Sequence, residues 1–213
     1  MTDLRLKLIA TAQAMQAAGL NRSTAGNVSV RSGDGFYITP TGMAYTALTA
    51  DDIPLMTLDG SDQGNYQGSR KPSSEWRFHR DLYATRPEVG AVVHAHSPFA
   101  VSLACLRYAI PPFHYMIARF GGDSIRCADY AIFGSESLST AALAAMQQRK
   151  GCLLANHGLL VAGRDLNEAF ALAVELEELC EQYWRACQLG QPVLLSADEM
   201  AAVLEKFAGY GQQ

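Results

Sequence analysis

Short strand-like segments joined by brief connections are the feature that most constrains the fold of this chain. Residues 27–31 and 36–39 form one such pair, residues 152–155 and 159–161 form another, and residues 55–58 are a further strand-like segment bounded by turn residues. A parallel connection needs about a dozen residues or more, so strands joined this closely must pair antiparallel. The sequence therefore predicts a sheet that is largely antiparallel.

Helical periodicity alternates with these segments over much of the chain. Apolar residues recur at helical spacing over 3–18, 75–83, a stretch ending at Leu106, 137–148 and 165–188. Asp165-x-x-Glu168 and Ser196-x-x-Glu199 are typical of helix starts, where side chains accept from free backbone N–H groups. We predict an α/β fold of three layers, with helices flanking a mixed, mostly antiparallel sheet, and one domain over residues 1–213.

Charge and hydropathy exclude several classes of partner. The net charge is −4, and no run of Lys or Arg is longer than the Arg70-Lys71 pair, so we expect no nucleic-acid partner. No apolar stretch approaches the ~18 residues of a membrane span, and charged residues such as Asp3 and Lys7 stand where a signal peptide is apolar. We expect no membrane association and a cytoplasmic location. The five cysteines are expected to be reduced, buried, small hydrophobic residues.

The motif His94-Ala95-His96 closes a short apolar run of buried-strand type. Alternate residues of a strand point to the same side, so two imidazoles placed in this way can share one metal ion. An ordinary polar face explains the pair equally well. His157 ends a second strand and is followed by Gly158, which permits a close backbone approach.

Glu75 is the carboxylate that could complete a tetrahedral site with these three histidines. It falls in the predicted first turn of a helix, where the helix dipole alone favours a glutamate, and on the residues alone this explanation ranks higher. His79 and His114 lack a strand-end placement. We expect His79 on an exposed or packed helix face and His114 in a loop.

Three loops of small, hydroxyl-rich residues, at 24–27, 39–42 and 73–74, offer hydroxyls and free N–H groups to an anion. Each by itself is more typical of an ordinary turn or cap. The Gly-rich loop with lysine that marks many nucleotide sites does not occur.

Taken together, these segments resemble the class II aldolase/adducin family, and especially its fuculose-phosphate aldolases. The matching segments are 24–31 (TAGNVSVR), 38–42 (ITPTG), 72–79 (PSSEWRFH), 91–94 (AVVH), 114–118 (HYMIA), 121–122 (GG), 157–159 (HGL), 203–207 (VLEKF) and 210–211 (YG). They run in order from near the first helix to the tail.

The resemblance implies a role for each matched position. His94, His96 and His157 would be zinc ligands, with Glu75 as fourth ligand and proton-transfer group. Tyr115 would reach a neighbouring subunit's site and protonate the aldehyde oxygen, in a homotetramer of C4 symmetry. The phosphate would be bound by Gly26, Asn27, Thr41, Gly42, Ser73 and Ser74, and the aldehyde end would be lined by Phe133 and Tyr210.

Some residues depart from the fuculose-phosphate pattern. Ala95 stands where that pattern has Asn, Asn156 replaces a His, and Arg119-Phe120 interrupts a run of small residues. These departures concern the aldehyde side and leave the implied metal and phosphate residues unchanged. Phe99 and Phe120, if they lie near the site, would favour an apolar substrate tail.

The implied activity is a zinc-dependent class II aldolase that reversibly cleaves a ketose 1-phosphate such as L-fuculose 1-phosphate. Its products would be dihydroxyacetone phosphate and a small aldehyde. The alternative substrates are 5-methylthioribulose or 5-deoxyribulose 1-phosphate. A 4-epimerase, a dehydratase, a metal-free binding module like the adducin head, and a divalent metal other than zinc are further alternatives.

Overall fold

A computed structural model describes residues 3–22, 24–59 and 64–208 of the chain. Within them one eight-stranded sheet has the order β4-β3-β2-β1-β5-β8-β7-β6. The strands are β1 (Asn27–Ser32), β2 (Gly35–Ile38), β3 (Leu55–Thr57), β4 (Tyr66–Gln67), β5 (Ala91–Ala95), β6 (Cys127–Ala128), β7 (Gly151–Leu154) and β8 (Gly158–Gly163).

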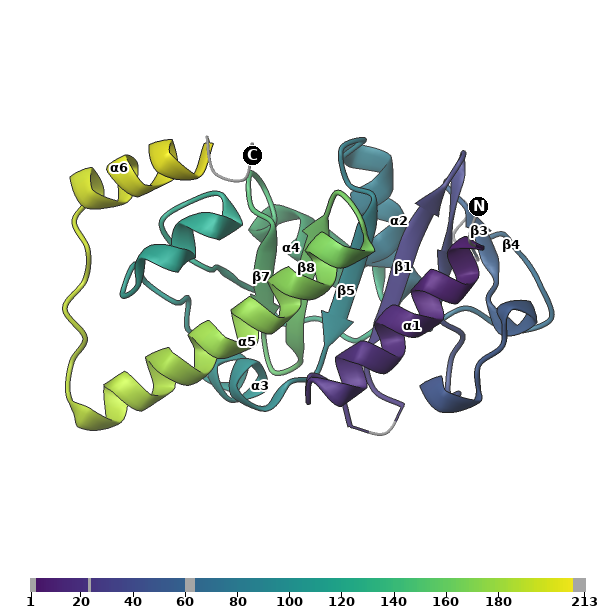
Figure 1. The fold of residues 1–213 in the computed structure, drawn as a ribbon, viewed down its shortest axis with the longest axis horizontal. Helices are drawn as coiled ribbons and strands as arrows, with labels where there is room; N and C mark the ends of the chain where they lie inside the picture. The colour runs from purple at the N-terminus through teal and green to yellow at the C-terminus, as the bar shows by residue number, and fades with distance from the viewer. Residues whose placement is uncertain (1–2, 23, 60–63, 209–213) are drawn as a thin grey trace.

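Helices cover both faces of this sheet (Figure 1). They are α1 (Leu4–Ala17), α2 (Trp76–Thr85), α3 (Pro98–Cys105), α4 (Glu136–Ala145), α5 (Leu166–Leu189) and α6 (Ala197–Ala208), with 3-10 helices η1 (Tyr45–Ala47), η2 (Ala50–Asp52) and η3 (Tyr115–Phe120). Helices α1, α3 and α5 share one hydrophobic core with the sheet, and α2 and α4 share a second core on the opposite face. The predicted three-layer α/β architecture is therefore confirmed.

Strand pairing follows the expected pattern. Among the described strands every pair is antiparallel except β6 with β7, which is parallel. The two pairs with the shortest connections, β1 with β2 and β7 with β8, are antiparallel, as their connection lengths require. The two-residue strands β4 and β6 escaped the sequence analysis because two residues cannot display an alternating pattern.

The predicted helix starts differ in how fully they are capped. Ser196 and Glu199 exchange hydrogen bonds reciprocally ahead of α6, which confirms the predicted capping box. At α5 the Asp165 carboxylate accepts from the Glu168 N–H at 2.8 Å, but Glu168 accepts from the Arg164 N–H and binds Lys150. Only one half of the second box is formed.

Cysteine burial was predicted only in part. All five cysteines are free thiols, and Cys152 and Cys180 are buried, but Cys105 and Cys187 are exposed. Cys105 is the last residue of α3, and Cys187 lies in the last turn of α5, where that helix extends past the sheet. Side chains at helix ends need not pack against the sheet, so an apolar residue there can remain exposed. Among the described helices none is long and apolar enough to cross a membrane.

Candidate active site

The register of the central strands brings the chemically active residues to one end of the sheet. Asn27 at the start of β1 lies opposite His94 near the end of β5, and Ala95 lies opposite Leu159 at the start of β8. His157 immediately precedes β8. Residues distant in the sequence therefore meet where β1, β5 and β8 run side by side.

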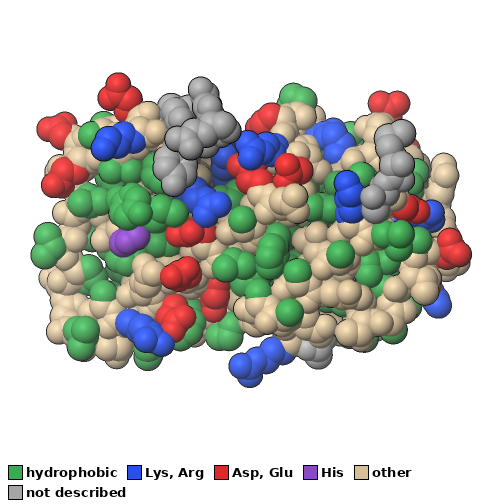
Figure 2. Space-filling view, viewed as in Figure 1, with side chains coloured by type: hydrophobic (Ala, Val, Ile, Leu, Met, Phe, Trp, Pro, Cys, Tyr) green, Lys and Arg blue, Asp and Glu red, His purple; other side chains and the backbone are tan. Residues whose placement is uncertain are grey.

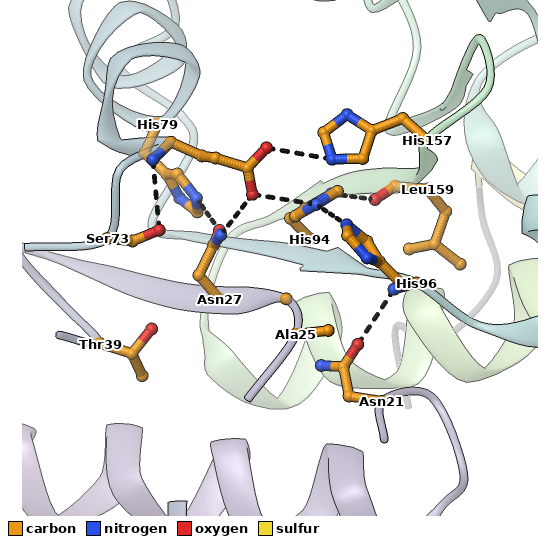
Figure 3. Close-up of polar contacts among 12 residues, drawn as sticks. Asn21, Ala25, Asn27, Thr39, Ser73, His79, His94, His96, His157 and Leu159 are labelled. Atoms are coloured by element: carbon orange, nitrogen blue, oxygen red, sulfur yellow. Dashed lines mark hydrogen bonds and ion pairs between the residues drawn. The ribbon is translucent and has the colours of Figure 1, made fainter. Parts of the chain in front are cut away.

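Four side chains converge at this point: Glu75, His94, His96 and His157. One candidate ligand atom from each lies within 4.8 Å of those from the other three. The three imidazole rings are 4.7–4.8 Å apart between centroids and stand edge to face at 70–78°. Figure 3 shows the rings turned toward one another. The structure thus brings together all four residues that the sequence analysis named as ligands.

The hydrogen bonds of His94 fit a cation at the centre of this group. Its Nδ1 lies 2.8 Å from the carbonyl oxygen of Leu159, which can only accept, so Nδ1 carries the proton. Its Nε2 then presents a lone pair to His96 Nε2 at 2.9 Å. Two facing lone pairs repel unless a proton or a metal ion lies between them, and a carbonyl-oriented histidine is the usual form of a metal ligand.

Glu75 directs its carboxylate into the same group. Oε2 lies 3.3 Å from His94 Nε2, and Oε1 lies 3.1 Å from His157 Nε2. Oε1 is buried without a hydrogen-bond partner of good geometry, as expected for an atom that would bind a metal. Burial by itself raises the pKa of Glu75, but the imidazoles of His94 and His157 outweigh it and hold that pKa far below its usual range.

The helix-dipole explanation of Glu75 does not match its placement. The residue precedes α2 instead of lying in its first turn, and its side chain makes no capping hydrogen bond. Its backbone N–H is bound by the Ser73 hydroxyl at 3.3 Å. The carboxylate therefore points away from the helix and into the histidine cluster.

His96 is fixed from the backbone side by Asn21. The side-chain Oδ1 of Asn21, from the α1–β1 connection, accepts from the backbone N–H of His96 at 3.0 Å. Burial, and then the neighbouring His94 and His157, lower the pKa of His96 to about 4. The ring is consequently neutral at physiological pH, which is the form that binds metals.

A tight turn delivers His157. Asn156 has φ of 53°, a conformation that Asn tolerates better than most residues, and the His157 N–H donates to the Leu154 carbonyl at 3.0 Å. A Cβ on Gly158 would lie 2.3 Å from the Ala95 carbonyl oxygen. The predicted close backbone approach at Gly158 is thereby confirmed.

The three predicted phosphate loops also meet. Pro40 and Pro72 form a bridge between the turn that contains Thr41 and Gly42 and the segment that precedes α2. The Ser73 N–H donates to Thr39, and the Thr41 N–H donates to Lys71. Ser73 is buried, while Ser74, Thr41 and Gly42 are exposed.

The third loop, Gly26-Asn27, joins them through β1. The Thr39 N–H donates to the Val28 carbonyl, and the Val28 N–H donates to the Thr39 hydroxyl. Gly26 has φ of 75°, and its carbonyl accepts from the Tyr45 hydroxyl at 2.8 Å. A Cβ on Gly26 would collide with the Asn21 side chain. Glycine is therefore required between the phosphate loop and the residue that holds His96.

Two of the predicted aldehyde-side residues, Tyr115 and Phe133, have exposed side chains. Tyr115 begins η3 with 51% of its surface exposed, and within the described residues it makes no hydrogen bond to the four ligands. Phe133 is 66% exposed, and Tyr210 lies outside the described residues. Phe120 is fully buried beside Gly151.

Two residues of the site were missed by the sequence analysis. Asn21 showed no pattern of its own. His79 is fully buried and binds the Asn27 amide. It therefore lies on a packed helix face, one of the two placements expected from the sequence. Its position four residues after Glu75, on the same helical face, was the available signal.

Comparison with known proteins identifies the family of this chain. A model of the class II aldolase and adducin N-terminal domain matches residues 6–184. The chain belongs to this family. Members that are class II aldolases depend on a metal ion, and the Glu75 and three-histidine group is where this chain could hold one. Its activity class is that of an aldolase lyase.

The names of individual relatives indicate candidate substrates. A 5-methylthioribulose-1-phosphate/5-deoxyribulose-1-phosphate aldolase of Rhodospirillum rubrum is 55% identical over 98% of this chain and 92% of its own length. An L-fuculose phosphate aldolase of Escherichia coli is 45% identical over 98% of this chain and 95% of its own. A solved L-fuculose 1-phosphate aldolase structure superposes with a TM-score of 0.92 at 37% identity, covering 98% of this chain and 97% of that one. The alternative substrates are therefore better supported than the fuculose phosphate that the sequence analysis ranked first.

Proposed function

We propose that this class II aldolase cleaves 5-methylthioribulose 1-phosphate or 5-deoxyribulose 1-phosphate, releasing dihydroxyacetone phosphate and a small aldehyde. The observation that carries the proposal is the 55% identity to an aldolase of that specificity, against 45% to a fuculose-phosphate aldolase, over equal shares of this chain. The two groups of substrates share the phosphate end and differ at the aldehyde end. The departures from the fuculose pattern at Ala95 and Asn156 adjoin His96 and His157.

We further propose zinc as the metal. Three neutral imidazoles and one carboxylate are a common tetrahedral donor set for Zn²⁺, and a carboxylate that can move away leaves a position for substrate. The bound ion would supply Lewis-acid stabilisation of the negative charge that develops on the substrate when the carbon–carbon bond breaks.

Glu75 is the proposed proton-transfer group at the carbon that becomes part of dihydroxyacetone phosphate. Its carboxylate is held ionised by the neighbouring imidazoles, and Oε1 lacks a hydrogen-bond partner of good geometry. An ionised carboxylate of this kind can accept and return a proton once substrate is in reach.

The phosphate group is proposed to lie between the Gly26-Asn27, Thr41-Gly42 and Ser73-Ser74 loops. Their convergence through the Pro40–Pro72 bridge supports this, as do the exposed Thr41 and Ser74 at the loop surfaces. Substrate bound there would have its carbonyl end near Glu75, since Ser73 binds the Glu75 backbone.

Tyr115 is proposed to act in the site of a neighbouring subunit of a C4 homotetramer, protonating the aldehyde oxygen. Its exposure, and that of Phe133, Tyr130 and Ile132, supports an association surface. Figure 2 shows hydrophobic side chains gathered near η3 and α6 at one end of the molecule.

The test is dihydroxyacetone phosphate release from 5-methylthioribulose 1-phosphate, 5-deoxyribulose 1-phosphate and L-fuculose 1-phosphate, with zinc-loaded and chelator-treated protein. We expect metal-dependent release with a higher kcat/KM for either of the first two. Faster cleavage of L-fuculose 1-phosphate would overturn the substrate assignment. Conversion of a substrate without dihydroxyacetone phosphate release would indicate an epimerase or dehydratase.

A further inference from the structure

A buried chain of hydrogen bonds runs from the interior of α2 to the Glu75 carboxylate. His79, with no exposed surface, lies one helical turn beyond Glu75. Its Nδ1 is 2.7 Å from the Ser29 hydroxyl, and its Nε2 is 2.5 Å from the side-chain amide oxygen of Asn27. The Asn27 amide nitrogen in turn lies 3.0 Å from Glu75 Oε2.

The chemistry of the last acceptor fixes the direction of every bond. An ionised carboxylate only accepts, so Asn27 must turn its NH₂ group toward Glu75 and its oxygen toward His79. His79 must then carry its proton on Nε2 in order to donate to that oxygen.

The same argument continues beyond the histidine. With the proton on Nε2, Nδ1 of His79 is an acceptor and takes the single proton of the Ser29 hydroxyl. The Tyr83 hydroxyl, 2.8 Å from the Ser29 oxygen, must therefore donate to it. One tautomer of His79 satisfies the whole chain, and the other would set the Nε2 lone pair against the Asn27 side-chain oxygen, whichever way the Ser29 hydroxyl turns.

We propose that His79 is a positioning residue for the reaction, and the proposal rests on the proposed role of Glu75. By donating from Nε2, His79 locks the Asn27 amide in the orientation that presents an N–H to Glu75. An unlocked amide can turn over, and its oxygen would then face the Glu75 carboxylate. Asn27 also belongs to the proposed phosphate loop, so the lock couples the substrate loop to the proton-transfer group.

A buried histidine that only stabilises the core is the competing explanation. Burial, followed by the neighbouring His94, lowers the pKa of His79 to about 3, so a neutral ring suits both explanations. They differ in what the ring must do, since a purely structural role needs a filled and hydrogen-bonded space but no N–H directed at Asn27.

The first experiment measures the tautomer. Nitrogen-15 NMR of zinc-loaded protein labelled at its five histidines, with His79→Gln to assign the signal, reports which ring nitrogen is protonated. We expect a proton on Nε2 and none on Nδ1. The opposite tautomer, or a mixture of the two, would overturn the proposal without reference to any activity.

The second experiment separates positioning from packing. Gln can replace the Nε2 donor, whereas Leu fills the space without donating. We expect His79→Leu to lower kcat by about 10–100-fold, the range usual for residues that orient ligands, with unchanged zinc content and little change in KM. His79→Gln should recover most of that loss.

Ser139→Ala is the matched control. Ser139 is a buried hydroxyl that also binds α2, through Asp81 at 2.6 Å, but it is not part of the chain to Glu75. It should leave kcat unchanged. Wild-type kcat in folded His79→Leu, or equal losses in His79→Gln and His79→Leu, would show a structural role only.

The two proposals can fail separately. Wild-type protein that releases no dihydroxyacetone phosphate from any of the three substrates would refute the proposed function, while the tautomer still decides the direction of the chain. Should His79→Leu not fold, the tautomer and the kcat of His79→Gln decide the matter.

Discussion

His94 Nε2 and His96 Nε2 lie 2.9 Å apart, and His94 has already committed its other nitrogen to the Leu159 carbonyl. Two imidazoles in this arrangement are stabilised by a shared cation and destabilised without one. Glu75 and His157 complete a ligand group whose atoms fall within 4.8 Å.

Removal of the metal should abolish aldol cleavage without unfolding the chain, because the two hydrophobic cores do not depend on the ligand group. Chelator-treated protein is expected to lose activity and to regain it with Zn²⁺, and the holoprotein should have the higher Tm because only the folded state offers the complete site. Mg²⁺ should not restore activity, because it prefers oxygen ligands to imidazoles. Full activity after verified metal removal would contradict the assignment.

Glu75→Gln should retain metal through its three histidines and lose activity. Gln keeps the side-chain shape but cannot accept a proton, so kcat should fall by about 10²–10⁴, the usual contribution of a general base or acid. Metal analysis and steady-state kinetics of the same preparation test this. Near-normal kcat with a full metal complement would remove Glu75 from the proton transfer.

Tyr115→Phe should also be inactive, and mixing it with Glu75→Gln provides a test of shared sites. If each site takes Tyr115 from a neighbouring subunit, hybrid tetramers contain sites with both native residues and should regain activity after refolding together. Hybrids no more active than the sum of the two variants would place Tyr115 in its own chain's site or outside catalysis.

Gly158→Ala should weaken metal binding as well as stability. The new Cβ would lie 2.3 Å from the Ala95 carbonyl oxygen, which must push β8 away from β5 and displace His157. Overpacking of this kind costs about 1–3 kcal/mol. Denaturant unfolding and zinc titration measure the two effects.

Gly33→Ala is its control. A Cβ there meets nothing within 4 Å, but the φ of 56° imposes backbone strain of about 1–2 kcal/mol. We expect a comparable loss of stability with unchanged zinc affinity. Equal weakening of zinc binding in both variants would show that the metal site responds to global stability and not to the β5–β8 contact.

The stability of the fold should decrease in mild acid partly because of His79. The pKa of His79 is lowered from 6.5 to about 3 in the folded state, mainly by burial. Between these values the unfolded chain binds a proton that the folded chain cannot, so stability is complete above about pH 6.5 and falls as pH decreases toward 3, by at most about 1.4 kcal/mol per pH unit.

His79→Gln removes this contribution while leaving the other titrating groups in place. The difference in unfolding free energy between variant and wild type should therefore change by up to about 1.4 kcal/mol per pH unit over this range. Urea unfolding at a series of pH values measures it. A difference that is independent of pH would show that folding does not lower the pKa of His79.

The fold was largely predictable because local rules decide it. Connection length required antiparallel pairing at β1–β2 and β7–β8, and the Ser196 capping box marked the start of α6. These signals involve residues close together in the sequence. The strands β4 and β6 and the exposure of Cys105 and Cys187 were not predicted, since they depend on where distant layers end.

For the site, the sequence by itself determined the donor types and their local spacing. His94 and His96 had to share one side of a strand, Gly158 had to permit a close approach, and the family resemblance followed from motifs in order. Tertiary structure alone decided that Glu75 turns away from its helix and that Asn21 and His79 support the ligand group. The physical reason is that a side chain's hydrogen-bond partner across 50 residues is set by strand register and helix packing, which no local pattern encodes.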